Sequence, residues 1–266
     1  MLEIKNLTVT TKDGIKILDN ISFYLRSGEI TALTGPSGSG KTTIVKTIMG
    51  ILDKKLTIEG EIYLDKKSIF DMSKKGKRKL CGSYLGYIPQ NPLTSFTEFY
   101  KIEDLMGETI KTHMNIKGDE LKSLIVTVLN EVNLWDTDRI LNSYPKQLSG
   151  GMLQRISMAL ILSLRPKYIF CDEASSALDK DNTEILLNIL EKMKKDSSIL
   201  FISHDIQSIA SLCDRVFVID RGKIIENKPK ESFFKNPQSA WSQIIVSFIT
   251  DNKQKKCEWK MTYDRT

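Results

Sequence analysis

The stretch ITALTGPSGSGKTTIVKTIM, residues 30–49, decides the fold of this chain. A short apolar segment enters a turn rich in glycine and serine, and a segment of helical pattern follows from Lys41. Strand, glycine-rich loop and helix in this order, with Lys41–Thr42–Thr43 at the helix start, form a phosphate-binding P-loop. A turn that merely joins a strand to a helix is the alternative, and the complete motif disfavours it. The stretch therefore predicts a site for a nucleoside triphosphate.

Each residue type in this loop has a physical reason to be there. Glycine tolerates positive φ and lets backbone N–H groups approach phosphate oxygens without a Cβ in the way. The start of the following helix adds unpaired donors and a partial positive charge. Lys41 is expected to reach the β- and γ-phosphates, and the Thr42 hydroxyl is expected to complete the shell of a Mg²⁺ ion.

A second motif lies farther along the chain, where an apolar segment, residues 167–171, ends in the carboxylates Asp172 and Glu173. The carboxyl ends of parallel strands are where α/β sheets place ligands. Asp172 is predicted to hold Mg²⁺, and Glu173 to orient and deprotonate an attacking water. Acidic residues often begin loops, so the meaning of this pair depends on the P-loop upstream.

Length and composition are those of one large folded domain. The chain has 266 residues, of which 41% are hydrophobic and 27% charged, and these are ordinary values for a globular protein. Its longest apolar runs fall far short of the ~20 residues of a membrane-spanning helix, and its first residues lack the pattern of a signal peptide. We therefore expect a cytosolic chain whose membrane role, if any, comes through a partner.

Cysteine and charge patterns point to no further site. The four cysteines form no C-x-x-C pair, so reduced thiols are expected rather than disulfides or a zinc site. The net charge is +6, with basic clusters at residues 74–79 and 253–256. Without interleaved aromatic residues or a nucleic-acid motif, these clusters indicate solvated surface and a tail.

Apolar periodicity predicts the remaining elements. Alternation at Ile21, Phe23 and Leu25 predicts a half-buried strand. Further strands are expected within residues 2–9 and, as a pair broken at Gly60, at 56–58 and 61–64. Buried strands at 168–171 and 199–202 flank a helix expected to open at Asp181 in a capping-box pattern. A hairpin formed by 215–220 and 223–226 closes the chain.

Residues 96–164 have helical periodicity instead. Six apolar residues fall on one helix face, namely Leu121, Leu124, Ile125, Val128, Leu129 and Val132. Strands that alternate with helices imply a parallel sheet. We predict one α/β domain over residues 1–250, with a mixed, mainly parallel sheet, an antiparallel β subdomain, an inserted α-helical subdomain at about 92–164, and a basic tail at 251–266.

The segment LSGGMLQR, residues 148–155, has a serine and paired glycines that suit a helix start with exposed backbone donors. It resembles the LSGGQ-type signature of ABC ATPases. The order of the other motifs agrees with that family: GPSGSGKT at 35–42, Gln90 after an apolar strand, IFCDE at 169–173, SSALD at 175–179 and SHD at 203–205. The resemblance runs from Leu2 to about Phe248. The segments IPQNPLTSF, YPKQLSGGMLQR and NPQSAWSQII are similar to the corresponding sequences of the oligopeptide/dipeptide/nickel importer branch.

This resemblance implies a P-loop NTPase core that binds ATP and Mg²⁺. It assigns the Walker A loop to Gly35, Pro36, Ser37, Gly38, Ser39, Gly40, Lys41, Thr42 and Thr43. Asp172 and Glu173 would be the Walker B pair, and Asp179 the acid of the D-loop beside the nucleotide.

The resemblance also implies roles for residues outside the P-loop. Gln90 would contact Mg²⁺ and the lytic water and sense a membrane subunit, while His204 would contact the γ-phosphate. Ser149, Gly150 and Gly151 would bind the γ-phosphate held by an opposing subunit, so two composite sites need a dimer. Catalysis is then assigned to Glu173, His204, Gln90 and Lys41, and the metal to Thr42, Gln90 and Asp172.

Two departures from the family pattern change the expectations. The early turn, residues 11–14, lacks the aromatic residue that many ABC ATPases stack on adenine, so adenine is expected to be held differently. Only Cys257 lies near the C-terminus, whereas peptide-importing relatives often carry a cysteine cluster there. We expect no iron–sulfur cluster. This expected absence favours the members of the branch that import nickel or metal chelates.

The resemblance predicts an ATP-hydrolysing subunit that lies peripherally on the cytoplasmic face of the plasma (inner) membrane and energises uptake of peptides or nickel and other metal chelates. Expected partners are a related second ABC ATPase subunit, two integral membrane permease subunits and an extracytoplasmic solute-binding protein, with no nucleic acid. A soluble ABC-type ATPase of a non-transport complex, such as phosphonate degradation, stays open. A sensor that only binds nucleotide is disfavoured by Glu173 and His204. The cargo is not encoded here, because such subunits do not contact it.

Overall fold

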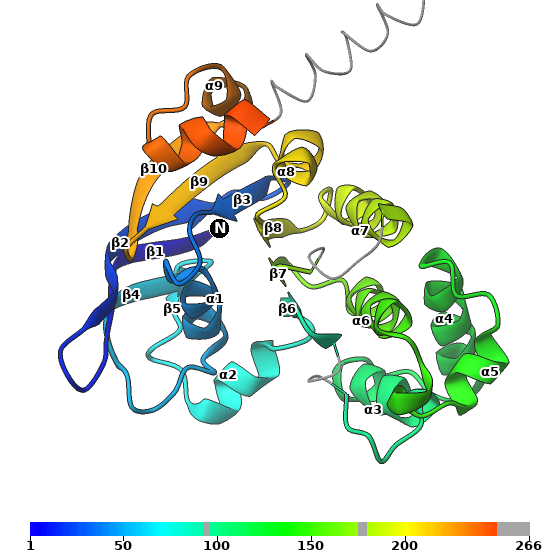
Figure 1. The fold of residues 1–266 in the computed structure, drawn as a ribbon. Coiled ribbons are helices and arrows are strands. Elements are labelled where there is room, and N and C mark those ends of the chain that lie inside the picture. The colour runs from blue at the N-terminus through cyan, green and yellow to red at the C-terminus, as the bar shows by residue number, and fades with distance from the viewer. Residues whose placement is uncertain (93–95, 175–179, 249–266) are drawn as a thin grey trace, which may run out of the picture.

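The computed structural model describes residues 1–92, 96–174 and 180–248, which form two sheets and a lobe of helices (Figure 1). The strands are β1 (Leu2–Thr10), β2 (Lys16–Leu25), β3 (Ile30–Thr34), β4 (Thr57–Leu64), β5 (Lys67–Ser68), β6 (Leu85–Ile88), β7 (Tyr168–Asp172), β8 (Ser198–Ile202), β9 (Arg215–Asp220) and β10 (Lys223–Pro229). One sheet has the order β2-β1-β4-β5 and the other β10-β9-β3-β8-β7-β6. The first is antiparallel, and in the second only the β9–β10 pair is antiparallel. The predicted fold class is confirmed.

The expected strand break at Gly60 is wrong, because β4 runs unbroken from Thr57 to Leu64. The register of β1 on β4 shifts between Lys5 and Thr8, where β1 advances three residues and β4 two, as in a β-bulge. Gly60 has φ +98°, and a Cβ there would lie 2.4 Å from the Asn6 carbonyl oxygen. Glycine therefore permits a close backbone approach within a continuous strand.

The six-stranded sheet separates two hydrophobic cores. All residues of β3, β7 and β8 are buried, as expected for parallel strands covered on both faces. Their side chains alternate, so that Leu33, Phe170 and Leu200 face a core shared with the antiparallel sheet and α1 (Lys41–Met49). Ala32 and Phe201 belong to the other core, which is shared with the helices. Helix α1 thus packs between the two sheets.

The remaining helices are α2 (Lys74–Leu80), α3 (Ile102–His113), α4 (Gly118–Glu131), α5 (Thr137–Asn142), the 3-10 helix η2 (Pro145–Gln147), α6 (Gly150–Leu164), α7 (Lys180–Met193), α8 (Ile206–Leu212) and α9 (Lys230–Lys235). A further helix at residues 240–248 lies beside α9. The predicted apolar face of α4 is confirmed, since Leu121, Ile125, Val128 and Leu129 are buried. Within the described ranges, no helix is long and apolar enough to cross a membrane.

Within the described residues, helix α7 includes Lys180, one residue before the predicted start at Asp181. Its first residue is Lys180, and Asp181 lies inside the first turn instead of capping it. An acidic side chain in the first turn still favours the helix through the partial positive charge there. The residues that precede α7, 175–179, lie outside the described part of the chain.

Candidate active site

The P-loop connects β3 to α1 and is held against two neighbouring strands. Gly35 has φ +150°, and a Cβ there would lie 1.9 Å from the Ile219 carbonyl oxygen. Gly40 has φ +106°, and its Cβ would meet the Leu18 side chain at 2.5 Å. No side chain caps the start of α1 at Gly40. The loop therefore forms a backbone cradle that excludes side chains and leaves helix N–H groups for an anion.

Lys41 lies at this loop with its ammonium group among backbone carbonyls. Its Nζ donates to the carbonyl oxygens of Gly35 at 3.0 Å and Pro36 at 2.9 Å. Burial lowers the pKa of Lys41, while the nearby carboxylates of Glu173 and Asp172 oppose that shift. A phosphate group can replace the carbonyl contacts and compensate the buried charge far better.

Asp172 ends β7 and is buried, with an exposed fraction of 4%. Its carboxylate accepts hydrogen bonds from the Thr42 hydroxyl at 3.1 Å and the Tyr87 hydroxyl at 3.1 Å. Burial raises the pKa of Asp172, and these two hydrogen bonds counteract the rise. The adjacent oxygens of Thr42 and Asp172, next to a phosphate cradle, are the donor set that Mg²⁺ prefers. The residues present therefore fit the metal.

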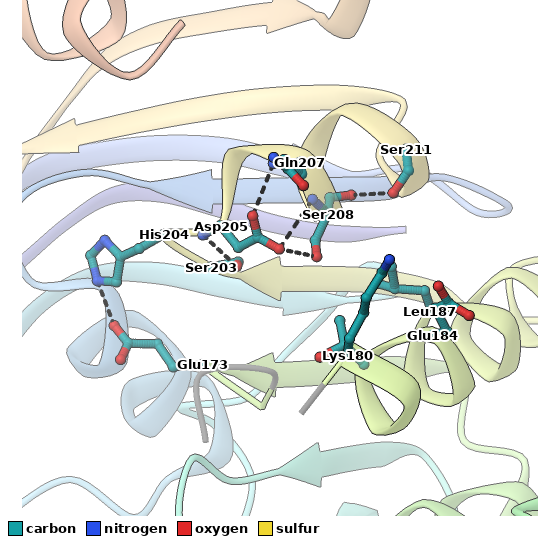
Figure 2. A pocket seen from close by; sticks show the side chains of 11 residues that line it. Glu173, Lys180, Glu184, Leu187, Ser203, His204, Asp205, Gln207, Ser208 and Ser211 are labelled. Carbon is teal, nitrogen blue, oxygen red and sulfur yellow. Dashed lines mark hydrogen bonds and ion pairs between the residues drawn. The ribbon is translucent and has the colours of Figure 1, made fainter. Parts of the chain in front are cut away.

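Glu173 follows β7 and is contacted from two other strand ends. Its Oε1 lies 2.7 Å from Nε2 of His204, after β8, and its Oε2 accepts a hydrogen bond of 2.9 Å from Gln90, after β6 (Figure 2 shows the His204 contact). Glu173 also has φ +49°. Left-handed backbone at a non-glycine residue is uncommon and concentrates at functional sites. The parallel sheet thus brings together three residues that are far apart in the sequence.

Two cavities meet at Glu173. A cavity of about 210 Å³ lies at the P-loop, and its lining comprises Ile17, Ser37, Gly38, Gly40, Lys41, Thr42, Thr43 and Glu173. A second cavity of about 760 Å³ opens at Glu173 and His204 and continues between α7 and α8 (Figure 2). Glu173 therefore lies where the phosphate cradle opens toward the rest of the surface.

The LSGG segment does not join this cavity within the chain. Ser149 caps α6 and accepts a hydrogen bond of 3.2 Å from the Met152 N–H, and Gly150 and Gly151 form the first turn. None of these three residues lines the P-loop cavity. Asp179, predicted to lie beside the nucleotide, falls outside the described residues.

Comparison with known proteins agrees with this geometry. The sequence profile of the ABC transporter family matches residues 18–176. The chain belongs to the ABC transporter family. CntD of Staphylococcus aureus strain Mu50, a metal-staphylopine import system ATP-binding protein, is 34% identical to this ABC ATPase over 250 residues, which cover 93% of this chain and 92% of CntD. DppD of Haemophilus influenzae, a dipeptide transport ATP-binding protein, is 30% identical, covering 94% of this chain and 78% of DppD.

Solved structures show the same fold. The ATP-binding cassette MJ0796, in a dimeric post-hydrolysis state bound to ADP and Pi, matches with a TM-score of 0.78 and 26% identity, over 86% of this chain and 99% of MJ0796. CbiO1 of Clostridium perfringens, part of the ABC transporter complex cbiONQ, matches with a TM-score of 0.74 and 27% identity, over 88% and 90% of the two chains. The chain is thus an ABC ATPase that binds ATP.

The structure of this ABC ATPase gives contacts to residues for which the sequence motifs predicted no role. Gln154 is 1% exposed, and its amide nitrogen donates to the carbonyl oxygens of Pro89 at 3.4 Å and Ala174 at 3.3 Å. It therefore ties α6 to the residues next to Gln90 and Glu173. A glutamine on the buried face of an apolar helix is a signal the sequence contains, whereas nothing in the sequence marks Tyr87.

Proposed function

We propose that this ABC ATPase is the nucleotide-hydrolysing subunit of an importer for peptides or nickel and other metal chelates. The observation that carries the proposal is the contact of Glu173 with both Gln90 and His204 at the opening of the P-loop cavity. A protein that binds a nucleotide without hydrolysing it needs the P-loop, but it does not need a general base that other side chains hold in place. Relatives named for import of metal-staphylopine and of dipeptides cover more than nine-tenths of the chain, which supports the importer.

In the proposed reaction the chain supplies positioning and charge. The P-loop backbone and Lys41 hold the β- and γ-phosphates, and Glu173 accepts the proton of the attacking water. Mg²⁺, held by Thr42, Gln90 and Asp172, would neutralise phosphate charge. His204 moves its hydrogen bond from Glu173 to the γ-phosphoryl oxygens as charge develops there. Gln90 holds one oxygen of the Glu173 carboxylate and the attacking water in the positions that proton transfer requires.

Two composite sites need a second subunit in this proposal. Ser149, Gly150 and Gly151 lie outside the P-loop cavity of their own chain, yet they form a capped helix start that suits an anion. They would close the site of a related but different ATPase subunit, and that subunit would close this one. Asp179 would contribute beside the nucleotide.

The proposed assembly comprises two permease subunits, an extracytoplasmic solute-binding protein and this subunit at the cytoplasmic face of the plasma membrane, without nucleic acid. Peptides and nickel or metal chelates are the proposed cargo. The absence of an iron–sulfur cluster remains a prediction: Cys171 and Cys213 are buried thiols, and Cys257 lies outside the described residues.

The test uses the variant Glu173→Gln, in which the amide keeps the shape of the side chain but cannot take a proton. We expect turnover to be abolished while ATP binding and ATP-induced dimerisation persist. Tagged Glu173→Gln protein with ATP should then capture two polytopic subunits, a sister ATPase and a solute-binding protein from gently solubilised native membranes. Retained turnover would refute the base assignment, and a purely soluble partner set would refute import.

A further inference from the structure

The imidazole of His204 has a second neighbour besides Glu173. The indole of Trp241 meets it edge to face, with ring centroids 6.5 Å apart and planes inclined by 75°. This separation and inclination are those at which aromatic rings attract each other. Trp241 belongs to the helix at residues 240–248. In the sequence, α8, β9, β10 and α9 lie between His204 and this helix.

The 240–248 helix is fixed to the main sheet by a buried carboxylate. Glu226 on β10 is 4% exposed and accepts hydrogen bonds from the backbone N–H groups of Ser239 at 2.7 Å and Gln238 at 3.2 Å. It also accepts one from the Ser242 hydroxyl. The Ser239 hydroxyl caps the helix by accepting from the Ser242 N–H at 3.1 Å. These contacts hold the first turn, and with it Trp241, against a strand of the sheet that carries the active site.

The indole is held in place without a hydrogen bond of its own. Its Nε1 is buried and has no partner among the described residues. A buried donor without a partner is unfavourable, and native structures contain few of them. An apolar side chain would fill the same space without that cost. The edge-to-face contact with the His204 ring is an interaction that an aliphatic side chain at this position would lack.

A second contact can restrict the His204 side chain further, because that side chain is partly exposed. It follows β8 in a turn, and its side chain is 35% exposed. An exposed side chain samples several rotamers, and each wrong rotamer removes Nε2 from Glu173. A second ring packed against the imidazole restricts this freedom before the reaction begins, which is how preorganised groups lower barriers.

We infer that Trp241 is a positioning residue, which holds the His204 imidazole in the orientation that reaches Glu173 and the γ-phosphate. This inference rests on the proposed function, in which His204 acts during hydrolysis. It gives the 240–248 helix a role in turnover, although that helix lines neither the P-loop cavity nor the adjoining cavity at His204.

The test measures kcat and KM for ATP on the full chain, co-purified with its partners, for wild type, Trp241→Leu, Trp241→Phe, His204→Ala and the double variant Trp241→Leu/His204→Ala. Loss of one aromatic contact should lower kcat of Trp241→Leu about 3- to 10-fold and leave KM within about twofold. Trp241→Phe keeps a ring and should recover most of the loss. In the His204→Ala background, Trp241→Leu should have no further effect, because the group it positions is gone.

Ile245→Ala serves as the matched control. Ile245 lies on the same helix, is 9% exposed and packs into the core, so its truncation loosens the helix without removing the ring. We expect this variant to lose thermal stability but to keep kcat within about twofold. An equal loss of kcat in Ile245→Ala, or an equal effect of Trp241→Leu with and without His204, would overturn the inference. If His204→Ala itself retains full kcat, the proposed role of His204 fails instead.

Discussion

The hydroxyl of Tyr87 offers the sharpest test of the proposed Mg²⁺ site, because the variant Tyr87→Phe removes a single oxygen atom. In Tyr87→Phe the Asp172 carboxylate keeps its 3.1 Å hydrogen bond from Thr42 but loses the 3.1 Å bond from Tyr87. The ring stays, so packing in β6 is conserved. We expect weaker Mg²⁺ binding with little change in ATP binding in the absence of metal.

The magnitude follows from the burial of Asp172, which is 4% exposed and has these two hydroxyl donors. A hydrogen bond to a charged group contributes about 1.5–3 kcal/mol, and about 1.4 kcal/mol corresponds to tenfold in a binding constant. Mg²⁺ affinity should therefore fall by roughly 10- to 100-fold, the range typical for partners that orient a metal ligand. Since the Tyr87 bond counteracts the burial that raises the pKa of Asp172, its loss raises that pKa further, and Mg²⁺ binding weakens most at acidic pH.

Isothermal calorimetry of Mg²⁺ into the full chain with saturating ATP measures this effect, with Glu173→Gln in every variant to prevent turnover. The matched control is Tyr84→Phe, whose hydroxyl donates to Asp65 instead of Asp172. That control should bind Mg²⁺ as the parent does. Unchanged affinity in Tyr87→Phe, or an equal loss in both variants, would show that the Tyr87 hydroxyl does not support Asp172 as a metal ligand.

Three further predictions concern the loop and the stability of the fold. Gly35→Ala should abolish ATP binding in equilibrium dialysis, because its Cβ would lie 1.9 Å from the Ile219 carbonyl oxygen; full binding by Gly35→Ala would contradict the tight cradle. Burial raises the pKa of Asp65, but hydrogen bonds from Lys167 and two tyrosines lower it overall. The stabilisation is therefore present above about pH 4 and lost as pH falls through the lowered pKa of the folded state. Asp65→Asn should lower the free energy of unfolding by about 1–3 kcal/mol in urea at pH 7. An unchanged urea midpoint would contradict this. Burial likewise raises the pKa of Glu226, and its hydrogen bonds lower it to about 2 from 4.5. This stabilisation, roughly 3 kcal/mol, is present above pH 4.5 and lost toward pH 2. Glu226→Gln should therefore speed hydrogen exchange in residues 239–248 at pH 7; protection equal to wild type would show that Glu226 does not hold this helix in place.

Much of the fold followed from local patterns. The P-loop, the buried strand before Asp172, the apolar face of α4 and the closing hairpin were all predicted from residues close together in the sequence. Such patterns are reliable because they reflect interactions between near neighbours: the period of a helix or strand, the freedom of glycine and the donors of a helix start. The break expected at Gly60 was wrong because a longer-range contact, the close approach of β4 to the Asn6 carbonyl oxygen, determines the local structure there.

The sequence alone predicted which groups bind phosphate and metal, because the P-loop residues are contiguous and lie together in any fold of the chain. Only the tertiary structure decided which distant side chains meet them. Tyr87 reaches Asp172, Gln90 and His204 reach Glu173, and Trp241 reaches His204. These contacts depend on strand order in the sheet and on the docking of the 240–248 helix. Strand order and docking arise from packing of the whole core, and no short stretch of sequence encodes them.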